Sequence, residues 1–256
     1  MSPRLLNDLF KAFPGAEHRS SVIHNIVSPE YFDEQTPKGL VFQIICNRLG
    51  SADAFRPIST AFDSDHKRNQ REDFNYLLMV LHAGTTQESH AFIECVGTSQ
   101  IFSMPRLKLV VVGSAGWDSA PILESFKPWA ERGDLFYLSN VPSAELRALY
   151  KHAAATICPS VAEGFDYTGV EAMRSGGIVV SSDIPVHREI YGGASEYFSP
   201  YSTEDASMVI RRAFSQDGGA VRERLRTEAL QVAEKYTSPN ILPKWSQLFE
   251  MPKPTQ

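Results

Sequence analysis

From Phe74 to the C-terminus, short and almost entirely apolar runs alternate with segments in which apolar residues recur with helical periodicity. Short continuous apolar runs are typical of strands buried on both faces, and the segments between them are typical of crossover helices. The predicted strands are Tyr76–Val80, Leu107–Val112, Leu135–Leu138, Ala155–Cys158, Ile178–Ser181 and Glu196–Phe198. This alternation predicts an α/β fold, with a Rossmann-like parallel sheet flanked by helices.

Helix signals lie between these strands and after the last of them. Ser143 is the predicted N-cap of one helix, and Pro239 stands at a first-turn position of a terminal helix that contains Trp245 and Phe249. The other predicted helices are Ala144–His152, Glu204–Phe214 behind Ser202 and Thr203, and Val221–Lys235. Residues 74–256 are therefore predicted to form one Rossmann-like domain with C-terminal helices.

Residues 1–73 follow a different pattern. A short helix is predicted at Arg4–Phe13 and an apolar, strand-like stretch at Ser21–Val27, followed by a long stretch without clear periodicity. Ser64–Asp73 is almost entirely polar and is typical of a solvated linker. The first 73 residues are therefore expected to lie outside the main domain.

Composition and charge exclude several classes of protein. The chain is 43% hydrophobic and 21% charged, as in a soluble globular protein, and its net charge of -5 offers no broad attraction for nucleic acid. No apolar run is long enough to span a membrane, and Met1–Phe13 lacks the apolar centre of a signal peptide. Cys46, Cys95 and Cys158 are too few and too far apart for a disulfide framework or a zinc knuckle. These features favour a cytoplasmic protein.

The segment Ser160–Met173 carries the clearest chemistry and reads S-V-A-E-G-F-D-Y-T-G-V-E-A-M. It follows a predicted strand, and Thr168 and Glu171 have the spacing of a capping box, which predicts a helix start at Thr168. Glu163 would then lie on the loop and Glu171 in the first helical turn. Such a loop, at the carboxyl end of a parallel strand, is where open α/β sheets bind ligands.

The N-terminus of this predicted helix favours a phosphate ligand. Free N–H groups near Gly169 and Val170 would point out of the helix, and glycines at 164 and 169 would allow a ligand to approach the backbone. The two glutamates could accept hydrogen bonds from sugar hydroxyls. They could equally be a capping residue and a solvent-exposed acid, or a hydrolytic pair, whose carboxylates stand about 5 to 9.5 Å apart. Eight residues of continuous helix rise about 12 Å, which weakens the hydrolase interpretation.

The motif P-S-x-x-E-G-F followed by E-A-M, with seven residues between the glutamates, resembles the signature of retaining family 4 glycosyltransferases of the GT-B fold. Further similar segments occur in the expected order. They are Leu107–Trp117, Leu146–Ser160 and Ile178–Glu189, with Tyr197, Phe198 and Pro200. The resemblance extends from Phe74 to the C-terminus, and the chain is similar to bacterial polysaccharide mannosyltransferases. It implies that residues 74–256 are the C-terminal, donor-binding half of a GT-B enzyme.

Upstream, Ser21–Phe32 resembles the crossover between the acceptor and donor domains of such enzymes. Residues 1–73 would then comprise the end of the acceptor domain, the crossover and a polar linker. The resemblance implies an N-terminal acceptor-binding domain that is missing from this chain. A glycan or lipid-linked acceptor would bind there, and the complete enzyme could associate with the inner face of the membrane.

The resemblance also assigns roles to individual residues. Glu163 is the catalytic acid near the donor sugar, Glu171 binds the ribose hydroxyls, and Gly113 lies beside the nucleoside. The remaining donor-binding residues are Gly164, Phe165, Asp166, Tyr167, Thr168, Gly169 and Val170. The family needs no metal or cofactor. The expected donor is a nucleotide-diphosphate sugar, with GDP-mannose as the first choice and UDP-sugars next.

One departure from the family pattern concerns the leaving diphosphate. The loop Leu81–His90 contains no Arg or Lys, and Gln87 and Glu88 stand where the family carries cations. Loss of such a charge typically costs several kcal/mol of transition-state stabilisation. The candidates for compensation are His82, His90, Arg174 and Arg188, although each is more often a surface or packing residue. The alternative function is therefore a catalytically degraded module that binds a nucleotide sugar without transferring it.

Two further signals carry little weight. Asp63-Ser64-Asp65 has the D-x-D form of a metal-diphosphate site, but no predicted strand precedes it. His187 follows Pro185 on a predicted loop and could face the cleft, although a lone loop histidine is more often structural. The seven histidines form no H-E-x-x-H motif or close Cys/His group, so no metal site is expected.

Overall fold

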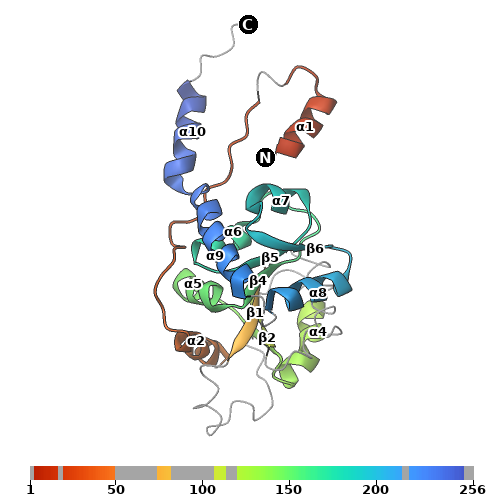
Figure 1. Ribbon diagram of the computed structural model, residues 1–256, viewed down its shortest axis with the longest axis vertical. Helices are drawn as coiled ribbons and strands as arrows, with labels where there is room; N and C mark the ends of the chain where they lie inside the picture. The colour runs from red at the N-terminus through yellow and green to blue at the C-terminus, as the bar shows by residue number, and fades with distance from the viewer. Residues whose placement is uncertain are drawn as a thin grey trace.

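The computed structural model describes residues 3–16, 20–49, 74–81, 107–113, 120–214 and 219–250. Within these ranges the centre of the protein is a six-stranded parallel sheet with the order β3-β2-β1-β4-β5-β6 (Figure 1). The strands are β1 (Asn75–Leu81), β2 (Leu107–Gly113), β3 (Leu135–Leu138), β4 (Ala155–Cys158), β5 (Val179–Ser182) and β6 (Ser195–Phe198). The predicted α/β fold and each predicted strand are confirmed, with ends that differ by a residue at most.

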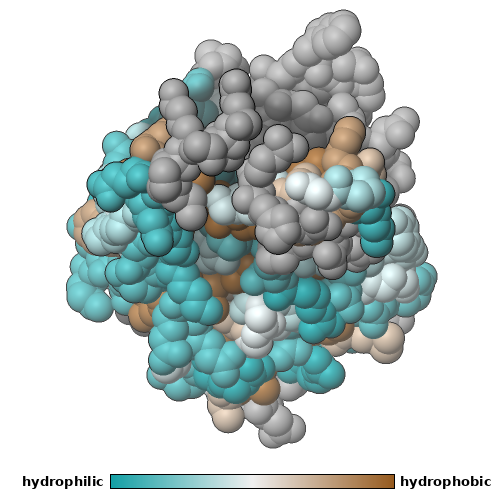
Figure 2. Space-filling view, turned by 90° about the horizontal axis from the view of Figure 1, so that it is seen from above, coloured by the Kyte–Doolittle hydropathy of each residue, from teal (hydrophilic) through white to brown (hydrophobic). Residues whose placement is uncertain are grey.

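Helices cover both faces of the sheet (Figure 1). The helices of the described part are α1 (Pro3–Ala12), α2 (Gly39–Leu49), α4 (Ala120–Glu131), α5 (Ser143–His152), α6 (Tyr167–Arg174), α7 (Pro185–Tyr191), α8 (Thr203–Phe214), α9 (Gly219–Glu234) and α10 (Ser238–Glu250). Helices α1 and α10 extend away from the body of the protein at the same end. Seen from that end, the surface is mostly hydrophilic, with hydrophobic residues in separate patches and in a recess near the middle (Figure 2).

The apolar strand pattern follows from burial on both faces. In β1, Tyr76 and Leu78 belong to the core that also contains residues of α2, α5 and α6. Their neighbours Leu77 and Met79 belong to the opposite core, with residues of α4 and α8. All four side chains are at most 1% exposed. Because successive side chains point to opposite faces, a strand between two helical layers has no solvent-facing position.

The N-terminal part differs from the prediction in two places. Ser21–Val27 forms neither strand nor helix: Val27 is buried and donates its N–H to the Tyr236 carbonyl, so this apolar stretch packs without joining the sheet. Helix α2 lies in the stretch where no periodicity was recognised. Its Ile45 is fully buried, and the helix packs against α5 and β3. The division at residue 73 stays a prediction, and the predicted linker lies outside the described residues.

The predicted cap of α5 is wrong. Ser143 is the first residue of the helix, and the N-cap is Pro142, which makes no side-chain capping bond. The Ser143 hydroxyl instead donates to Glu30 Oε2 at 2.7 Å. The Ser143 side chain therefore makes a tertiary contact and does not form the cap that the local sequence pattern predicted.

Polar contacts hold the segment after Val27 along α5. Arg147 donates to the Glu30 carbonyl at 2.7 Å and to the Glu34 carboxylate at 2.9 Å. Lys151 forms an ion pair with Asp33. This segment carries Tyr31, and the contacts place Tyr31 beside helix α6.

Gly177, between α6 and β5, allows a test of how closely helices α5 and α6 pack. A Cβ at this position would lie 2.6 Å from the Tyr150 carbonyl oxygen and 3.0 Å from that of Ala172, both backbone atoms. We expect Gly177→Ala to lower the free energy of unfolding by about 1 to 3 kcal/mol, the usual range for overpacking. Urea unfolding followed by circular dichroism measures this. The matched control is Gly219→Ala, where an added Cβ meets nothing within 4 Å; equal stability of the two variants would contradict the packing described.

Candidate functional site

A cavity of about 220 Å³ opens at the carboxyl ends of β1 and β4. Its lining residues are Met79, Val80, Leu81, Ile157, Cys158, Pro159, Ser160, Glu163, Phe165, Asp166, Tyr167 and Thr168. In the strand order of this sheet, β1 and β4 flank the point where the chain changes direction across the sheet. Open α/β sheets bind ligands in the crevice at this switch point. The predicted loop therefore lines a cavity in the position expected for a ligand site.

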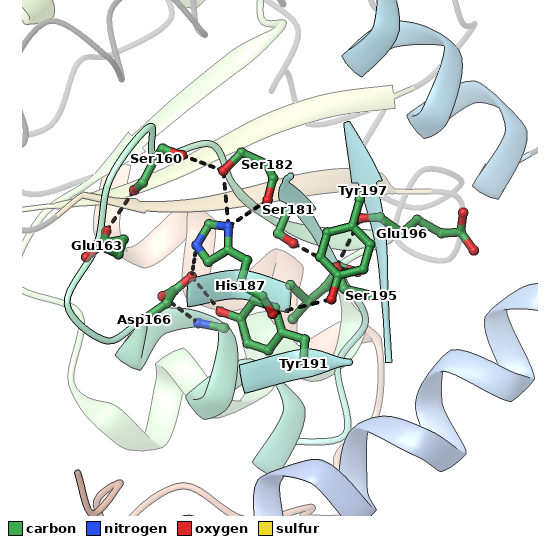
Figure 3. Close-up of polar contacts among 12 residues, drawn as sticks. Ser160, Glu163, Asp166, Ser181, Ser182, His187, Tyr191, Ser195, Glu196 and Tyr197 are labelled. Atoms are coloured by element: carbon green, nitrogen blue, oxygen red, sulfur yellow. Dashed lines mark hydrogen bonds and ion pairs between the residues drawn. The ribbon is translucent and has the colours of Figure 1, made fainter. Parts of the chain in front are cut away.

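Glu163 is held on this loop by a neighbouring serine. The hydroxyl of Ser160 donates to Glu163 Oε1 at 2.8 Å (Figure 3). Farther along the loop, the ring of Phe165 packs edge-on against Tyr167 and Tyr236, with centroid distances of 5.0 and 5.3 Å. The loop thus presents a carboxylate and aromatic rings to the cavity.

The helix after the loop begins differently from the prediction. Helix α6 starts at Tyr167, and its N-cap is Asp166, whose Oδ1 accepts from the N–H of Gly169 at 3.1 Å. The predicted capping box of Thr168 and Glu171 is therefore wrong, and Glu171 lies beyond the first turn. The Gly169 N–H is not free for a phosphate, because the Asp166 carboxylate already occupies it.

Packing explains the glycine at position 169. A Cβ there would lie 1.9 Å from the hydroxyl oxygen of Tyr191, which donates to Asp166 Oδ2 at 2.5 Å. By contrast, Gly164 is exposed, and an added Cβ would meet nothing within 4 Å. Of the two glycines, the structure leaves only Gly164 with open space around it.

Asp166 is a buried carboxylate that is 6% exposed. Burial by itself would raise its pKa, but His187, the Tyr191 hydroxyl and the Gly169 N–H together lower the pKa below the usual value. His187 Nε2 lies 3.2 Å from Asp166 Oδ2 (Figure 3). The structure places His187 in α7, fully buried, rather than on the predicted loop. No local sequence signal pairs it with Asp166, because the two residues meet only through the order of the strands.

Glu171 lies in different surroundings from Glu163 and is not among the residues that line the cavity. The Tyr150 hydroxyl donates to Glu171 Oε2 at 3.2 Å, and Tyr31 lies close by. Burial raises the pKa of Glu171 to about 7, although the hydroxyls of Tyr150 and Tyr31 oppose the shift. The ribose-binding role of Glu171 stays a prediction.

Gly113 stands at the end of β2, beside the end of β1. Its carbonyl accepts from the Tyr137 hydroxyl at 3.1 Å, and an added Cβ would lie 3.2 Å from the Cβ of Leu81. The residue is at the carboxyl edge of the sheet but does not line the cavity. Its position beside a nucleoside stays a prediction.

The cavity walls described above include no Arg or Lys side chain. Two candidates for compensating cations are engaged elsewhere. Arg188 binds Asp183 at 2.7 Å and stacks over Tyr197, and Arg174 donates to the Tyr31 carbonyl at 2.8 Å. The other residues that the sequence analysis considered for the diphosphate lie outside the described ranges: His82, Gln87, Glu88, His90 and the Asp63–Asp65 triplet.

The described ranges hold neither a metal-binding cluster nor a membrane-spanning helix. No group of three His, Cys, Asp or Glu side chains there is arranged to hold a metal ion. None of the helices in those ranges is both long enough and apolar enough to cross a membrane. Metal-independence stays a prediction.

The parallel sheet and the cavity at its switch point define a Rossmann-like α/β domain. Residues 61–232 match the family described as glycosyl transferases group 1. This range covers most of the chain and includes the whole segment from β1 to α8. The protein therefore belongs to the glycosyl transferases group 1 family.

Similar curated proteins are bacterial glycosyltransferases. The O-antigen chain mannosyltransferase RfbU of Salmonella typhimurium is 31% identical over 147 residues, which cover 56% of this chain and 40% of RfbU. The O-antigen chain mannosyltransferase B of Escherichia coli is 28% identical over 135 residues, which cover 53% of this chain and 35% of that protein. The matches therefore span less than half the length of either relative.

Solved structures share the fold. A glycosyltransferase from Rickettsia africae ESF-5 aligns with a TM-score of 0.70 and 16% identity over 97% of this chain and 62% of its own. WaaG, a glycosyltransferase involved in lipopolysaccharide biosynthesis, aligns with a TM-score of 0.66 and 14% identity over 98% of this chain and 62% of its own. At these identities the likeness concerns the fold alone, and it confirms the predicted GT-B type of fold.

The contacts of Asp166 predict a large effect on stability. Asp166→Ala would leave the Tyr191 hydroxyl, the Gly169 N–H and His187 buried without their partner. We expect the free energy of unfolding to fall by about 2 to 4 kcal/mol, because each buried polar group left unsatisfied costs about 1 to 3 kcal/mol. The control is Asp183→Ala, which removes an exposed ion pair with Arg188 and should cost about 1 kcal/mol or less. Chemical denaturation of the two variants gives the comparison; similar losses would contradict the role of Asp166.

The raised pKa of Glu171 predicts that the difference in stability between the wild type and Glu171→Gln depends on pH. Its pKa is about 7 in the folded protein and 4.5 in the unfolded chain, so the folded state holds the proton more tightly. As pH rises from about 4.5 to 7, the wild type should lose stability relative to Glu171→Gln, by up to about 3 kcal/mol, since one pKa unit is about 1.4 kcal/mol. Tyr150→Phe removes a hydrogen bond to the ionised form and should move the pKa higher. Urea unfolding across this range measures the effect, and a difference that is constant with pH would refute it.

Proposed function

We propose that this chain is the donor-binding part of a retaining family 4 glycosyltransferase that takes a nucleotide-diphosphate sugar as donor. One observation carries the proposal: in a member of the glycosyl transferases group 1 family, the Glu163 loop lines a cavity at the switch point of the sheet. Family membership favours this transferase over a module that binds without turnover.

The cavity suits a sugar by its chemistry. The carboxylate of Glu163 is aligned by Ser160 and can accept hydrogen bonds from sugar hydroxyls. Apolar and aromatic walls, which include Met79, Leu81 and Phe165, can pack against the C–H faces of a sugar ring. In the transition state, a fixed carboxylate would also stabilise positive charge that develops at the anomeric carbon.

The charge of the site constrains where the diphosphate is neutralised. Two acids, Glu163 and Asp166, line the cavity, and the described lining supplies no Lys or Arg. In the complete enzyme, the positively charged groups that neutralise the diphosphate would therefore lie outside this lining. A second domain would also bind the glycan or lipid-linked acceptor, since transfer needs both substrates in one cleft.

GDP-mannose is our first choice of donor. The names of two relatives specify mannosyl transfer, and the name of a third, from Streptococcus pneumoniae, specifies UDP-N-acetylglucosamine. Polysaccharide assembly at the cytoplasmic side of the membrane is the setting that we propose.

Isothermal titration with GDP-mannose, UDP-N-acetylglucosamine, GDP and UDP tests the proposal. We expect one sugar nucleotide to bind. We expect Glu163→Gln to lower its affinity about tenfold, because a hydrogen bond to a charged group is worth roughly 1.5 to 3 kcal/mol. The same variant should bind the free nucleotide as the wild type does, because Glu163 is assigned to the sugar. Glu228→Gln, on α9, is the control. Absence of binding by all four compounds, or wild-type affinity in Glu163→Gln, would refute the assigned role.

A further inference from the structure

A continuous chain of polar contacts leads from helix α7 to the carboxylate of Glu163 (Figure 3). His187 Nδ1 lies 3.1 Å from the hydroxyl oxygen of Ser182 and 2.9 Å from the Ser182 carbonyl oxygen. The Ser182 hydroxyl donates to the carbonyl of Ser160. The Ser160 hydroxyl in turn donates to Glu163 Oε1 at 2.8 Å. A buried imidazole is thus connected, through two serines, to the acid assigned to the donor sugar.

The count of donors and acceptors decides the role of His187 Nδ1. A serine hydroxyl has one hydrogen, and that of Ser182 is used by the Ser160 carbonyl. Towards His187, both oxygens of Ser182 can therefore only accept. Nδ1 must carry a hydrogen and donate, because otherwise lone pairs would face one another inside a fully buried site. The ring therefore holds the Ser182 hydroxyl as an acceptor, which directs its hydrogen to Ser160.

The other nitrogen of the same ring faces the far end of the loop. Nε2 lies 3.2 Å from Asp166 Oδ2, an ion-pair contact whose geometry falls outside that of a hydrogen bond. Asp166 also accepts from Gly169 and Tyr191, which anchors it to α6 and α7. One imidazole is consequently connected to both ends of the loop that begins at Ser160 and ends at Asp166.

We propose that His187 is a positioning residue: it clamps the Ser160–Asp166 loop at both ends and so sets the orientation of Glu163 in the cavity. The inference rests on the proposed function, in which Glu163 contacts the donor sugar. His187 itself is fully buried and does not line the cavity. Its effect on binding must therefore pass through the loop.

A purely structural role would be satisfied by a ring of similar size. His187 stacks on Tyr191, with ring centroids 5.5 Å apart and planes inclined by 26°, and Phe can keep this stacking. Phe cannot donate to Ser182. Asn can, because its side-chain amide reaches roughly the position of Nδ1. His187→Phe and His187→Asn therefore separate packing from hydrogen bonding at the same position.

The serines of β5 supply a second, matched pair. Ser181 and Ser182 are adjacent, fully buried and hydrogen-bonded. The hydroxyl of Ser182 reaches the loop, whereas that of Ser181 lies 3.0 Å from the Ser195 hydroxyl on β6. Ser182→Ala breaks the chain to Glu163, and Ser181→Ala leaves it intact.

The experiment compares the affinities of these four variants for the sugar nucleotide that binds the wild type and for its free nucleotide diphosphate, by isothermal titration. We expect His187→Phe and Ser182→Ala to lower the affinity for the sugar nucleotide about tenfold, or about 1.4 kcal/mol. Their affinity for the free nucleotide should stay within about twofold of the wild type. His187→Asn should recover most of the loss, and Ser181→Ala should bind both compounds as the wild type does. Circular dichroism and thermal unfolding establish that each variant is folded. If His187→Phe does not fold, the Ser182→Ala and Ser181→Ala pair carries the test.

The outcomes separate this inference from the proposed function. If the wild type binds the sugar nucleotide and the folded His187→Phe and Ser182→Ala variants bind it equally well, the positioning role is overturned while the proposed function stands. Equal losses for the sugar nucleotide and the free nucleotide would also overturn it, because they indicate general damage. A wild type that binds neither GDP-mannose nor UDP-N-acetylglucosamine, nor GDP or UDP, would overturn both.

Discussion

The buried carboxylate of Asp166 is the constraint on which the candidate site depends. An ionised carboxylate that is 6% exposed is costly unless hydrogen-bond donors surround it. Here the donors come from the first turn of α6, through Gly169, and from α7, through Tyr191, with His187 at ion-pair distance. The glycine is required because the Tyr191 hydroxyl occupies the space of its Cβ. The loop, α6 and α7 can therefore adopt this arrangement only together.

Glu163 and Glu171, which are separated by seven residues, consequently lie in different chemical environments. Glu163 stands before the cap, on the loop over the ends of β1 and β4, where it lines the cavity. Glu171 follows the cap and lies close to Tyr150 and Tyr31. With a pKa of about 7, Glu171 is partly protonated at neutral pH, so it can donate as well as accept. The same strand–loop–helix unit thus supplies two acids with different capacities.

Local patterns predicted most of the elements well and the caps of the helices poorly. Each strand was predicted, most of them because burial on both faces leaves few polar residues in the run. The caps at Ser143 and Thr168 were not, because hydrogen bonds to residues distant in the chain determine what those ends do: Ser143 binds Glu30, and Asp166 caps α6 with support from Tyr191. Helix α2 was missed because its apolar residues extend around much of its surface, which weakens the periodic signal.

The sequence by itself determined the strands and most of the helices in their order along the chain, and it determined that Glu163 lies on the loop between β4 and α6. Both follow from residues adjacent in the chain, whose periodicity and spacing can be interpreted without a fold. Only the tertiary structure decided which side chains surround that loop. Ser182, His187 and Tyr191 reach it because β5 lies beside β4. Tyr31 and Tyr150 reach Glu171 because the segment after Val27 packs along α5. Such contacts join residues that are distant in sequence, so they depend on strand order and helix packing, which no local pattern encodes.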